Sequence, residues 1–358
     1  MKRFSGISLI IAGLCLPLLA QQTQPLEVNI QIKKETQFQN PIVTQRADGQ
    51  VYQAPDGFLY YMGTVPEYDR LELRRAKTLN ELGTTKEIKT IWTKHATGQM
   101  GSHIWAPEIH NIDGKWYVYF AAGESKNIWT ISVFALENDN PNPLEGTWTE
   151  KGQIKLNWNT FALDFTTFVH NGTRYGIWAE KDPAAPNINS SLYIAKMDSP
   201  TSIVGKGVKI STPEFPWEIV KYKVNEGPAV LFKNGKIFLT YSASATDANY
   251  CMGMLTADDK ADLLDPKSWS KSKDPVLKTD ERAGVFGPGH NSFITLPDTK
   301  EDVIIYHARS YKDIKGDPLN DPNRCQRAQV IHWNPDGTPN FMPPVPDAAG
   351  KKFPPIAP

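Results

Sequence analysis

The chain has 358 residues, a length that fits either two small domains or one large body built from repeats. Lysine plus arginine and aspartate plus glutamate each total 39, so the chain lacks the positive field that binds nucleic acid or an anionic membrane surface. Hydrophobic residues at 40%, aromatic residues at 11% and a mean hydropathy of -0.43 indicate a globular protein with a substantial core and a soluble surface.

The chain begins with the pattern of an export signal. A basic start is followed by an apolar stretch over residues 7–19 and by the small residue Ala20. This pattern predicts a signal peptide over residues 1–20, cleaved near Ala20, and a soluble periplasmic or secreted product without membrane contact after cleavage. Cys15 could instead indicate a lipoprotein, but Leu14 before it is larger than the small residue that such a cleavage site requires.

Five turn signals followed by aromatic-rich strands recur along the chain. Asp-Gly and Asn-Gly favour the positive φ angles of a tight hairpin, and alternating aromatic residues suit a pleated strand. The five segments begin at residues 56, 113, 171, 234 and 298 and read DGFLYYMGTV, DGKWYVYFAA, NGTRYGIWAE, NGKIFLTYSA and DTKEDVIIYHAR. They are spaced 57, 58, 63 and 64 residues apart, a near-constant period that indicates repeats rather than two unrelated domains.

About sixty residues per repeat are enough for four short strands with loops, and five such units arranged radially would close a ring without long exposed edges. The sequence therefore predicts an all-β fold, a single five-bladed β-propeller over residues 35–350. The segment RLELRRAKTLNELG at residues 70–83 is predicted as strand and loop, although its composition also suits a helix. The tail from residue 334 is predicted as an extended closing strap.

Polar residues recur at one position in these repeats. Eight residues before the five turns stand Asp48, Trp105, Leu163, Glu226 and His290, with Asp164 one residue from its slot. If the strand before each turn is the innermost strand of its blade, its start faces the central axis, and three acids, an indole and an imidazole converge on one cavity. Ionised carboxylates are costly to bury, so this recurrence favours a functional site over capping or salt-bridged carboxylates.

The residue types of this group suggest a reaction class. Carboxylates without a cysteine, serine or metal-ligand motif indicate general acid and base chemistry, and glycoside hydrolysis needs such a pair across the scissile bond. Trp105 is suited to stacking on the apolar face of a sugar, and its alternative is an ordinary core position.

The sequence resembles glycoside hydrolase family 43 over about residues 40 to 345. The resemblance rests on blocks in a shared order: NPIVTQRADGQVY, VPEYDRLELRRAKTLNEL, IWAPEIHNIDGKWYVYFAA, LDFTTFVHNGTRYGIWAE, NEGPAVLFKNGKIFLTYSAS, GPGHNSF and NDPNRCQRAQ. It implies a five-bladed propeller enzyme that hydrolyses arabinan, xylan or related plant polysaccharides. By the same resemblance, Asp48 is the general base, Glu226 is the general acid, and Asp164 orients the acid and raises its pKa.

The resemblance also implies an inverting mechanism, in which Asp48 deprotonates a water while protonated Glu226 gives its proton to the departing oxygen. No cofactor is expected for catalysis. His290 matches a histidine that lies near a structural cation in relatives, which makes a structural calcium the candidate metal there, and the alternative for His290 is a hydrogen-bonded core histidine. Two residues depart from the family pattern. Gly49 replaces the usual proline after the base and would loosen the backbone there, and Cys325 stands where relatives tend to carry histidine.

The blocks after the acid resemble most the α-L-arabinofuranosidase branch, which implies removal of terminal arabinofuranose from arabinan or arabinose-decorated polymers. Trp105 and Arg309 are the candidate substrate contacts, with a surface ion pair as the alternative for Arg309. A β-xylosidase or exo-galactosidase would use the same carboxylates. A non-catalytic glycan-binding propeller is a further alternative, against which the intact set of three acids argues.

Two cysteines, Cys251 and Cys325, remain after the predicted cleavage. They lie far apart in sequence, so a disulfide between them can be proposed but cannot be deduced from their spacing. The alternative is a pair of buried or half-buried thiols.

Overall fold

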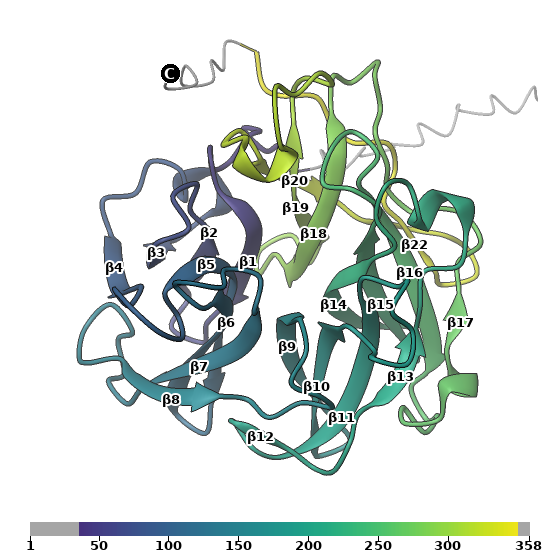
Figure 1. Ribbon diagram of the computed structural model, residues 1–358. Helices are drawn as coiled ribbons and strands as arrows, with labels where there is room; N and C mark the ends of the chain where they lie inside the picture. The colour runs from purple at the N-terminus through teal and green to yellow at the C-terminus, as the bar shows by residue number, and fades with distance from the viewer. Residues whose placement is uncertain (1–35, 350–358) are drawn as a thin grey trace, which may run out of the picture. The chain divides into compact units, whose positions relative to one another are not determined.

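Five antiparallel β-sheets surround a central axis in the computed structural model, which describes residues 36–349 (Figure 1). Each sheet is a meander of consecutive strands, and the first strand of each sheet, β1, β5, β9, β14 or β18, lies nearest the centre of the view. The predicted five-bladed β-propeller is therefore confirmed. The predicted signal peptide, residues 1–20, lies outside the described residues.

The blades follow one another along the chain. The first contains β1 (Ala47–Gln53), β2 (Leu59–Thr64), β3 (Arg70–Ala76) and β4 (Ile88–Thr93), and the second contains β5 (Ser102–Ile112), β6 (Lys115–Gly123), β7 (Ser132–Asn138) and β8 (Thr149–Gln153). The third contains β9 (Ala162–His170), β10 (Thr173–Glu180) and β11 (Ser191–Ser199), with β12 (Ser202–Ile203) and β13 (Val208–Ser211) both paired to β11.

The fourth blade contains β14 (Asn225–Lys233), β15 (Lys236–Ala243), β16 (Cys251–Asp258) and β17 (Ser270–Lys271). The fifth contains β18 (Phe286–Thr295), β19 (Asp302–Arg309) and β20 (Cys325–Val330), and a separate hairpin joins β21 (His332–Trp333) to β22 (Pro339–Asn340). The helices within residues 36–349 are all short 3-10 turns: η1 (Leu79–Glu81), η2 (Pro216–Glu218), η3 (Pro266–Ser268) and η4 (Pro318–Asn320).

All five predicted turns connect the first strand of a blade to its second strand. In the second, third and fourth blades both turn residues have positive φ: Asp113 (52°) and Gly114 (83°), Asn171 (48°) and Gly172 (73°), Asn234 (54°) and Gly235 (71°). This is the backbone that a two-residue type I′ hairpin requires, and it explains why Asp-Gly and Asn-Gly occur there. Residues 70–83 form β3 and a loop containing η1, as the strand-and-loop prediction states.

The N-terminal end of the described chain completes the fifth blade. The amide of Ile42 donates to the carbonyl of Gln326 at 2.8 Å, and the amide of Gln326 donates to the carbonyl of Val43 at 2.8 Å. The side-chain amide of Asn40 binds both backbone groups of Ala328 at 2.9 Å. These bonds cover the edge of β20 that β19 leaves open, so the first and last parts of the ring are joined by backbone pairing.

The core lies in layers between neighbouring blades, because each sheet buries both faces against the next. Three of these hydrophobic clusters join the first blade to the second, the second to the third, and the fifth to the first. Phe341 of the tail is buried between the fourth and fifth blades, and Arg327 pairs with Asp347 at 2.9 Å. The described part of the tail is therefore strapped onto the fifth blade, while the pairing that closes the ring comes from residues 42–43.

Cys251 and Cys325 are both buried and free, so no disulfide joins them. Among residues 36–349, no helix is long and apolar enough to cross a membrane.

Candidate active site

A backbone irregularity recurs in the innermost strand of every blade. The pairing register against the second strand shifts within β1, β5, β9, β14 and β18. Each strand has a shift at which one residue has positive φ: Asp48 (51°), Ala106 (45°), Asp164 (57°), Gly227 (57°) and His290 (45°). Strands β5 and β18 each have a second shift, beside His103 (48°) and Gly287 (61°). Such a β-bulge adds a residue to one strand and re-aims the side chains beside it. The five bulges therefore define one repeated position around the axis.

This repeated position corrects the count from the turns. Asp164 occupies the same slot as Asp48 and His290, whereas Trp105 and Glu226 lie one residue before the bulge residue of their blades. The reason is the length of the connections. The first and fifth blades use longer connections between their first two strands than the two-residue turns of the other three blades, so a fixed offset from the turn is not a fixed place in the strand.

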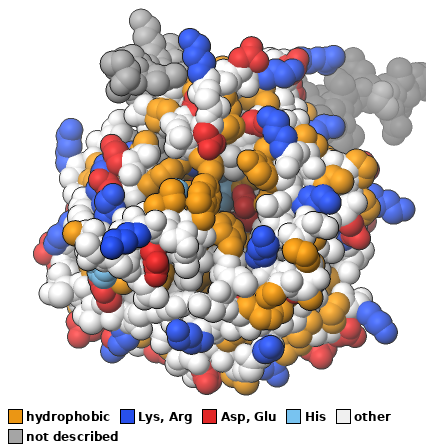
Figure 2. All heavy atoms as spheres, viewed as in Figure 1, with side chains coloured by type: hydrophobic (Ala, Val, Ile, Leu, Met, Phe, Trp, Pro, Cys, Tyr) orange, Lys and Arg blue, Asp and Glu red, His pale blue; other side chains and the backbone are white. Residues whose placement is uncertain are grey.

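The bulges bring the predicted polar residues together at the axis. Nδ1 of His290 lies 3.4 Å from Oδ1 of Asp48 and 3.9 Å from Oδ2 of Asp164. The amide of Gly227, the residue after Glu226, donates to Oδ2 of Asp164 at 2.8 Å. Figure 2 shows this face hollowed near its centre, with hydrophobic side chains at the rim and acidic and histidine atoms at the bottom. Three predicted acids and His290 thus form one site.

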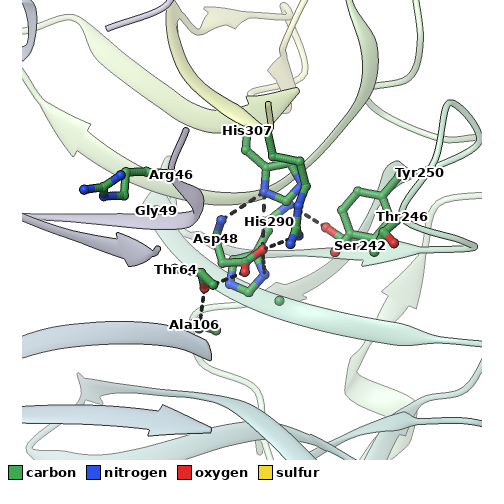
Figure 3. A network of polar contacts seen from close by, with 12 residues as sticks. Arg46, Asp48, Gly49, Thr64, Ala106, Ser242, Thr246, Tyr250, His290 and His307 are labelled. Carbon is green, nitrogen blue, oxygen red and sulfur yellow. Dashed lines mark hydrogen bonds and ion pairs between the residues drawn. The ribbon is translucent and has the colours of Figure 1, made fainter. Parts of the chain in front are cut away.

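Asp48 is buried at the centre of a polar network that Figure 3 shows from close by. Its Oδ2 accepts a hydrogen bond from the hydroxyl of Thr64 at 2.7 Å, and its Oδ1 lies 3.2 Å from the guanidinium of Arg324. Burial alone would raise the pKa of Asp48, but the charge of Arg324, followed by contributions from His290 and His307, holds that pKa well below its usual range. Asp48 is therefore ionised at neutral pH.

His307 and Arg324 are site residues that the sequence did not single out. Nδ1 of His307 accepts a hydrogen bond from the amide of Asp48 at 3.0 Å, and burial lowers the pKa of His307 to about 3, so its ring is neutral. His307 is a polar residue in the mostly apolar segment IIYHAR. Arg324 lies in NDPNRCQRAQ, one of the blocks that resemble the family. A search for polar residues in buried strands would have marked His307, but nothing local connects either residue to Asp48.

Glu226 has the opposite protonation behaviour. Burial raises the pKa of Glu226 to about 7, the hydroxyl of Tyr250 lowers it by donating to Oε1 at 2.8 Å, and the charge of Asp48 raises it. The ring of Tyr250 stacks on His307 with 5.5 Å between centroids, so one aromatic pair contacts both Glu226 and the backbone of Asp48. The site thus holds one ionised carboxylate and one carboxyl that retains its proton near neutral pH.

Asp164 is buried and interacts electrostatically with both of these groups. Burial raises its pKa well above the usual range, and the negative charges of Glu226 and Asp48 add to this rise, while the amide of Gly227 opposes it. Neighbouring carboxylates disfavour each other's ionisation, so Asp164 and Glu226 together retain a proton at neutral pH. The bond to Gly227 also ties Asp164 to the backbone directly after Glu226.

Removal of the hydroxyl of Tyr250 is expected to shift the alkaline side of the pH profile. Activity that needs protonated Glu226 falls as pH rises through the pKa of about 7. The hydroxyl stabilises the ionised form, so Tyr250→Phe raises this pKa and moves the alkaline limb of kcat/KM upward by about one pH unit. Tyr241→Phe is the matched control, because Tyr241 donates to Glu218 outside this site. An unchanged limb in Tyr250→Phe would contradict the role of the hydroxyl.

Trp105 belongs to an aromatic group at the edge of the site. Its ring contacts Tyr68, His103 and Trp129 at centroid distances of 5.4, 4.4 and 6.0 Å. Trp105 itself is 8% exposed and also packs in a core cluster, whereas Trp129 is 52% exposed. The structure thus places Trp105 at the boundary between the two predicted roles, core residue and sugar contact. Its indole Nε1 is buried without a hydrogen-bond partner in the described chain.

Arg309 has a different place from either expectation. Its side chain is 2% exposed, and its guanidinium donates to Oδ1 of Asp321 and to the carbonyls of Thr246 and Pro318 at 3.0, 2.7 and 2.7 Å. These bonds use the three nitrogens of the guanidinium, so Arg309 is neither a surface ion pair nor an exposed group that meets a substrate. Arg309 therefore bonds to residues after β15 and to residues that precede β20.

His290 does not complete a metal site with its neighbours. Among residues 36–349, no group of three or more His, Cys, Asp or Glu side chains is arranged to hold a metal ion. Calcium takes six to eight oxygen ligands, which the side chains around His290 do not supply. These side chains alone do not supply a set of calcium ligands, so a structural calcium near His290 stays a prediction, and no catalytic step is derived through it.

The two departures from the family pattern, Gly49 and Cys325, lie in two segments that contact each other, residues 45–49 and residues 325–326. The side chain of Gln326 packs where a Cβ on Gly49 would lie, with Cδ only 2.5 Å from that position. The thiol of Cys325 accepts a hydrogen bond from the amide of Gln45 at 3.3 Å. Gly49 thus makes room for Gln326, and the bond from the amide of Asp48 to His307 holds the backbone that the glycine was expected to loosen.

Comparison with known proteins gives consistent matches. The family model described as Glycosyl hydrolases family 43 matches residues 38–339. The chain is 55% identical over 346 residues to the extracellular exo-alpha-(1->5)-L-arabinofuranosidase of Streptomyces avermitilis, which covers 97% of this chain and 70% of that protein. It is 52% identical over 310 residues to alpha-L-arabinofuranosidase 43 of Humicola insolens, covering 87% of this chain and 64% of that protein.

A solved structure gives the same result for the fold. The crystal structure of alpha-L-arabinofuranosidase from Lactobacillus brevis matches with a TM-score of 0.84 and 50% sequence identity, covering 87% of this chain and 98% of that chain.

Proposed function

The chain belongs to glycosyl hydrolases family 43 and is a glycosidase, and on this premise we propose that it is a secreted, exo-acting, inverting α-L-arabinofuranosidase. Its substrate would be arabinan or another arabinose-decorated plant polysaccharide, from which it removes terminal arabinofuranose. The relatives and the solved structure compared above all carry the name arabinofuranosidase, and the relative from Streptomyces avermitilis is named extracellular and exo-acting. These names support the sugar, the location and the mode of action.

One observation carries the mechanism: the site holds two carboxyl groups whose pKa values are displaced in opposite directions. The pKa of Asp48 lies well below its usual range, and that of Glu226 is raised to about 7. Inverting glycosidases need such a pair, an ionised base on one face of the sugar and a protonated acid on the other. Of the three acids described for this site, Asp48 is the one that forms an ion pair with an arginine, Arg324.

In this mechanism Asp48 accepts a proton from a water molecule as that water attacks the anomeric carbon. Glu226 gives its proton to the glycosidic oxygen, so the leaving sugar departs as a neutral alcohol. Asp164 holds the amide of Gly227 and thereby the backbone beside the acid, and its burial next to Glu226 keeps a proton on the pair. We assign no catalytic cofactor, and Trp105 remains the proposed sugar contact at the edge of the site.

The anomer of the first product tests the inverting assignment. We expect proton NMR during hydrolysis of an α-1,5-linked arabino-oligosaccharide to show β-arabinofuranose first, before mutarotation. The inverting arrangement leaves room for a water between base and sugar, whereas a retaining enzyme would form a covalent intermediate with a nearer carboxylate. Initial release of the α anomer would contradict the assignment of Asp48 as a base.

The same reactions test the substrate class. Chromatography of products from linear arabinan, arabinoxylan, xylo-oligosaccharide and galactan should show monomeric arabinose from the first two substrates. Release of xylose or galactose instead would favour the β-xylosidase or exo-galactosidase alternative. Binding to these glycans without any product would favour a non-catalytic propeller.

A further inference from the structure

Arg309 is a buried arginine near the active site that the proposed mechanism does not use. It ends β19, and its guanidinium reaches across to two loops. One nitrogen donates to the carbonyl of Thr246, which follows β15 in the fourth blade, at 2.7 Å. The others donate to Oδ1 of Asp321 and to the carbonyl of Pro318. A planar guanidinium with donors in three directions can hold these groups in one fixed geometry, which a lysine cannot.

The acceptors at 318 and 321 belong to one loop, defined here as the 317–324 loop, which leads into β20. The carboxylate of Asp321 accepts hydrogen bonds from within this loop and from residues outside it. Oδ1 of Asp321 also accepts from the amide of Asn323 at 3.0 Å, and Oδ2 accepts from the hydroxyl of Tyr311 at 2.6 Å. Arg309 therefore supplies the positive charge that balances a buried carboxylate on which the loop is folded.

The last residue of this loop is Arg324, whose guanidinium lies against Asp48. Nη1 of Arg324 is 3.2 Å from Oδ1 of Asp48, and Nη2 donates to the hydroxyl of Tyr68 at 3.2 Å. That hydroxyl in turn donates to the carbonyl of Leu319, which is next to the Pro318 carbonyl that Arg309 holds. The same loop borders a small pocket beside the base that is lined by Thr64, Tyr68 and Arg324 together with Leu319 and its neighbours.

We propose that Arg309 is a positioning residue of the active site: it fixes the 317–324 loop, and the fixed loop holds the guanidinium of Arg324 against Asp48. The inference rests on the proposed function, because it takes ionised Asp48 as the base. Arg309 acts through geometry, since its own charge is balanced by Asp321 at 3.0 Å.

The groups that face Asp48 decide what a displaced Arg324 would do. Besides Arg324, the charged or titratable groups around Asp48 are His290 of β18, His307 of β19, Asp164 of β9, Glu226 of β14, and Tyr61 and Tyr250. Both histidines have lowered pKa values and the other groups are acids, so Arg324 is the permanent positive charge of this set. When Arg324 moves away, burial favours protonated Asp48, and the activity of the base is lost from the acid side.

The test compares Arg309→Lys with Arg324→Gln by kcat/KM over a range of pH on an arabino-oligosaccharide. Arg324→Gln is expected to move the acid limb to higher pH. Arg309→Lys is expected to move it in the same direction by a smaller amount, although the lysine keeps the positive charge. At pH values below the raised pKa of Asp48 in such a variant, kcat/KM falls roughly tenfold for each pH unit, because the ionised fraction of the base falls tenfold. The double variant is expected to show the limb of Arg324→Gln alone, since Arg309 acts through Arg324.

Two further variants keep the test decisive. Asp321→Asn removes the ion pair while preserving shape, and it should also move the acid limb if Arg309→Lys folds poorly. Arg74→Lys is the matched control, because Arg74 is a buried arginine that pairs with Glu72 at 2.8 Å and holds the carbonyl of Leu82. It is expected to lower Tm without moving the limb.

The outcomes separate this inference from the proposed function. An acid limb that moves in Arg324→Gln but stays in place in folded Arg309→Lys and Asp321→Asn would overturn the role of Arg309 alone. An acid limb that stays in place in Arg324→Gln would overturn Asp48 as the ionised base, and the role of Arg309 with it. Additive shifts in the double variant would show that Arg309 does not act through Arg324, which also overturns the inference.

Discussion

Glu226→Gln is expected to lose about 10²- to 10⁴-fold in kcat/KM on an arabino-oligosaccharide, and far less on a dinitrophenyl arabinofuranoside. A natural glycoside departs as a poor leaving group and needs a proton, which the glutamine amide cannot supply. A dinitrophenolate is stable as an anion and leaves without one. The comparison is made on kcat/KM, so that altered binding of the ground state does not disguise the effect.

Glu180→Gln is a suitable control for this variant. Glu180 is also fully buried with a raised pKa, but it bonds Trp178 and the amide of Trp158 in the third blade, away from the site. It should change Tm while leaving the ratio of rates on the two substrates unaltered. Equal losses on both substrates in Glu226→Gln would show that Glu226 does not protonate the leaving group.

Asp48→Asn is expected to lose about 10²- to 10⁴-fold in kcat/KM on both substrates alike. The base activates water, a step that is required whatever group departs, so the loss should not depend on the leaving group. Asparagine keeps the shape of the side chain, and its amide oxygen can still accept the hydrogen bond from Arg324, while its amide nitrogen takes the place of Oδ2 and can donate to the hydroxyl oxygen of Thr64. The fold should therefore persist, which circular dichroism and melting would verify.

Asp302→Asn is the matched control for the base. Asp302 is a buried aspartate at the start of β19, and it pairs with Lys233 at the end of β14 at 2.8 Å. Its loss should lower stability without a large change in kcat/KM. A strong dependence of the Asp48→Asn loss on the leaving group would contradict its assignment as the base and would exchange the two roles.

The blade architecture follows from local sequence chemistry. Asp113-Gly114, Asn171-Gly172 and Asn234-Gly235 form two-residue hairpins because only a few residue types adopt positive φ at low cost. The period of these turns and the apolar strands beside them are also local properties. Five similar hairpins at a regular spacing are therefore enough to predict a ring of five blades.

The acids could be predicted because each of them belongs to a repeated position at the head of its blade. The exact slot could not, since the bulge that places Asp48, Asp164 and His290 around the axis depends on strand pairing rather than on distance from the turn. Closure of the fifth blade by residues 42–43 likewise depends on pairing between segments at opposite ends of the described chain.

The sequence by itself thus determined the fold class, the family resemblance and the three candidate acids. Only the tertiary structure decided the protonation states and the surroundings of those acids. Arg324 is 276 positions from Asp48 in the chain, and the two meet because the ring closes. Burial and the charges of such distant neighbours fix a carboxyl's pKa, and no local pattern records them. For the same reason Arg309 was predicted as a substrate contact or a surface ion pair, whereas its side chain lies in the interior.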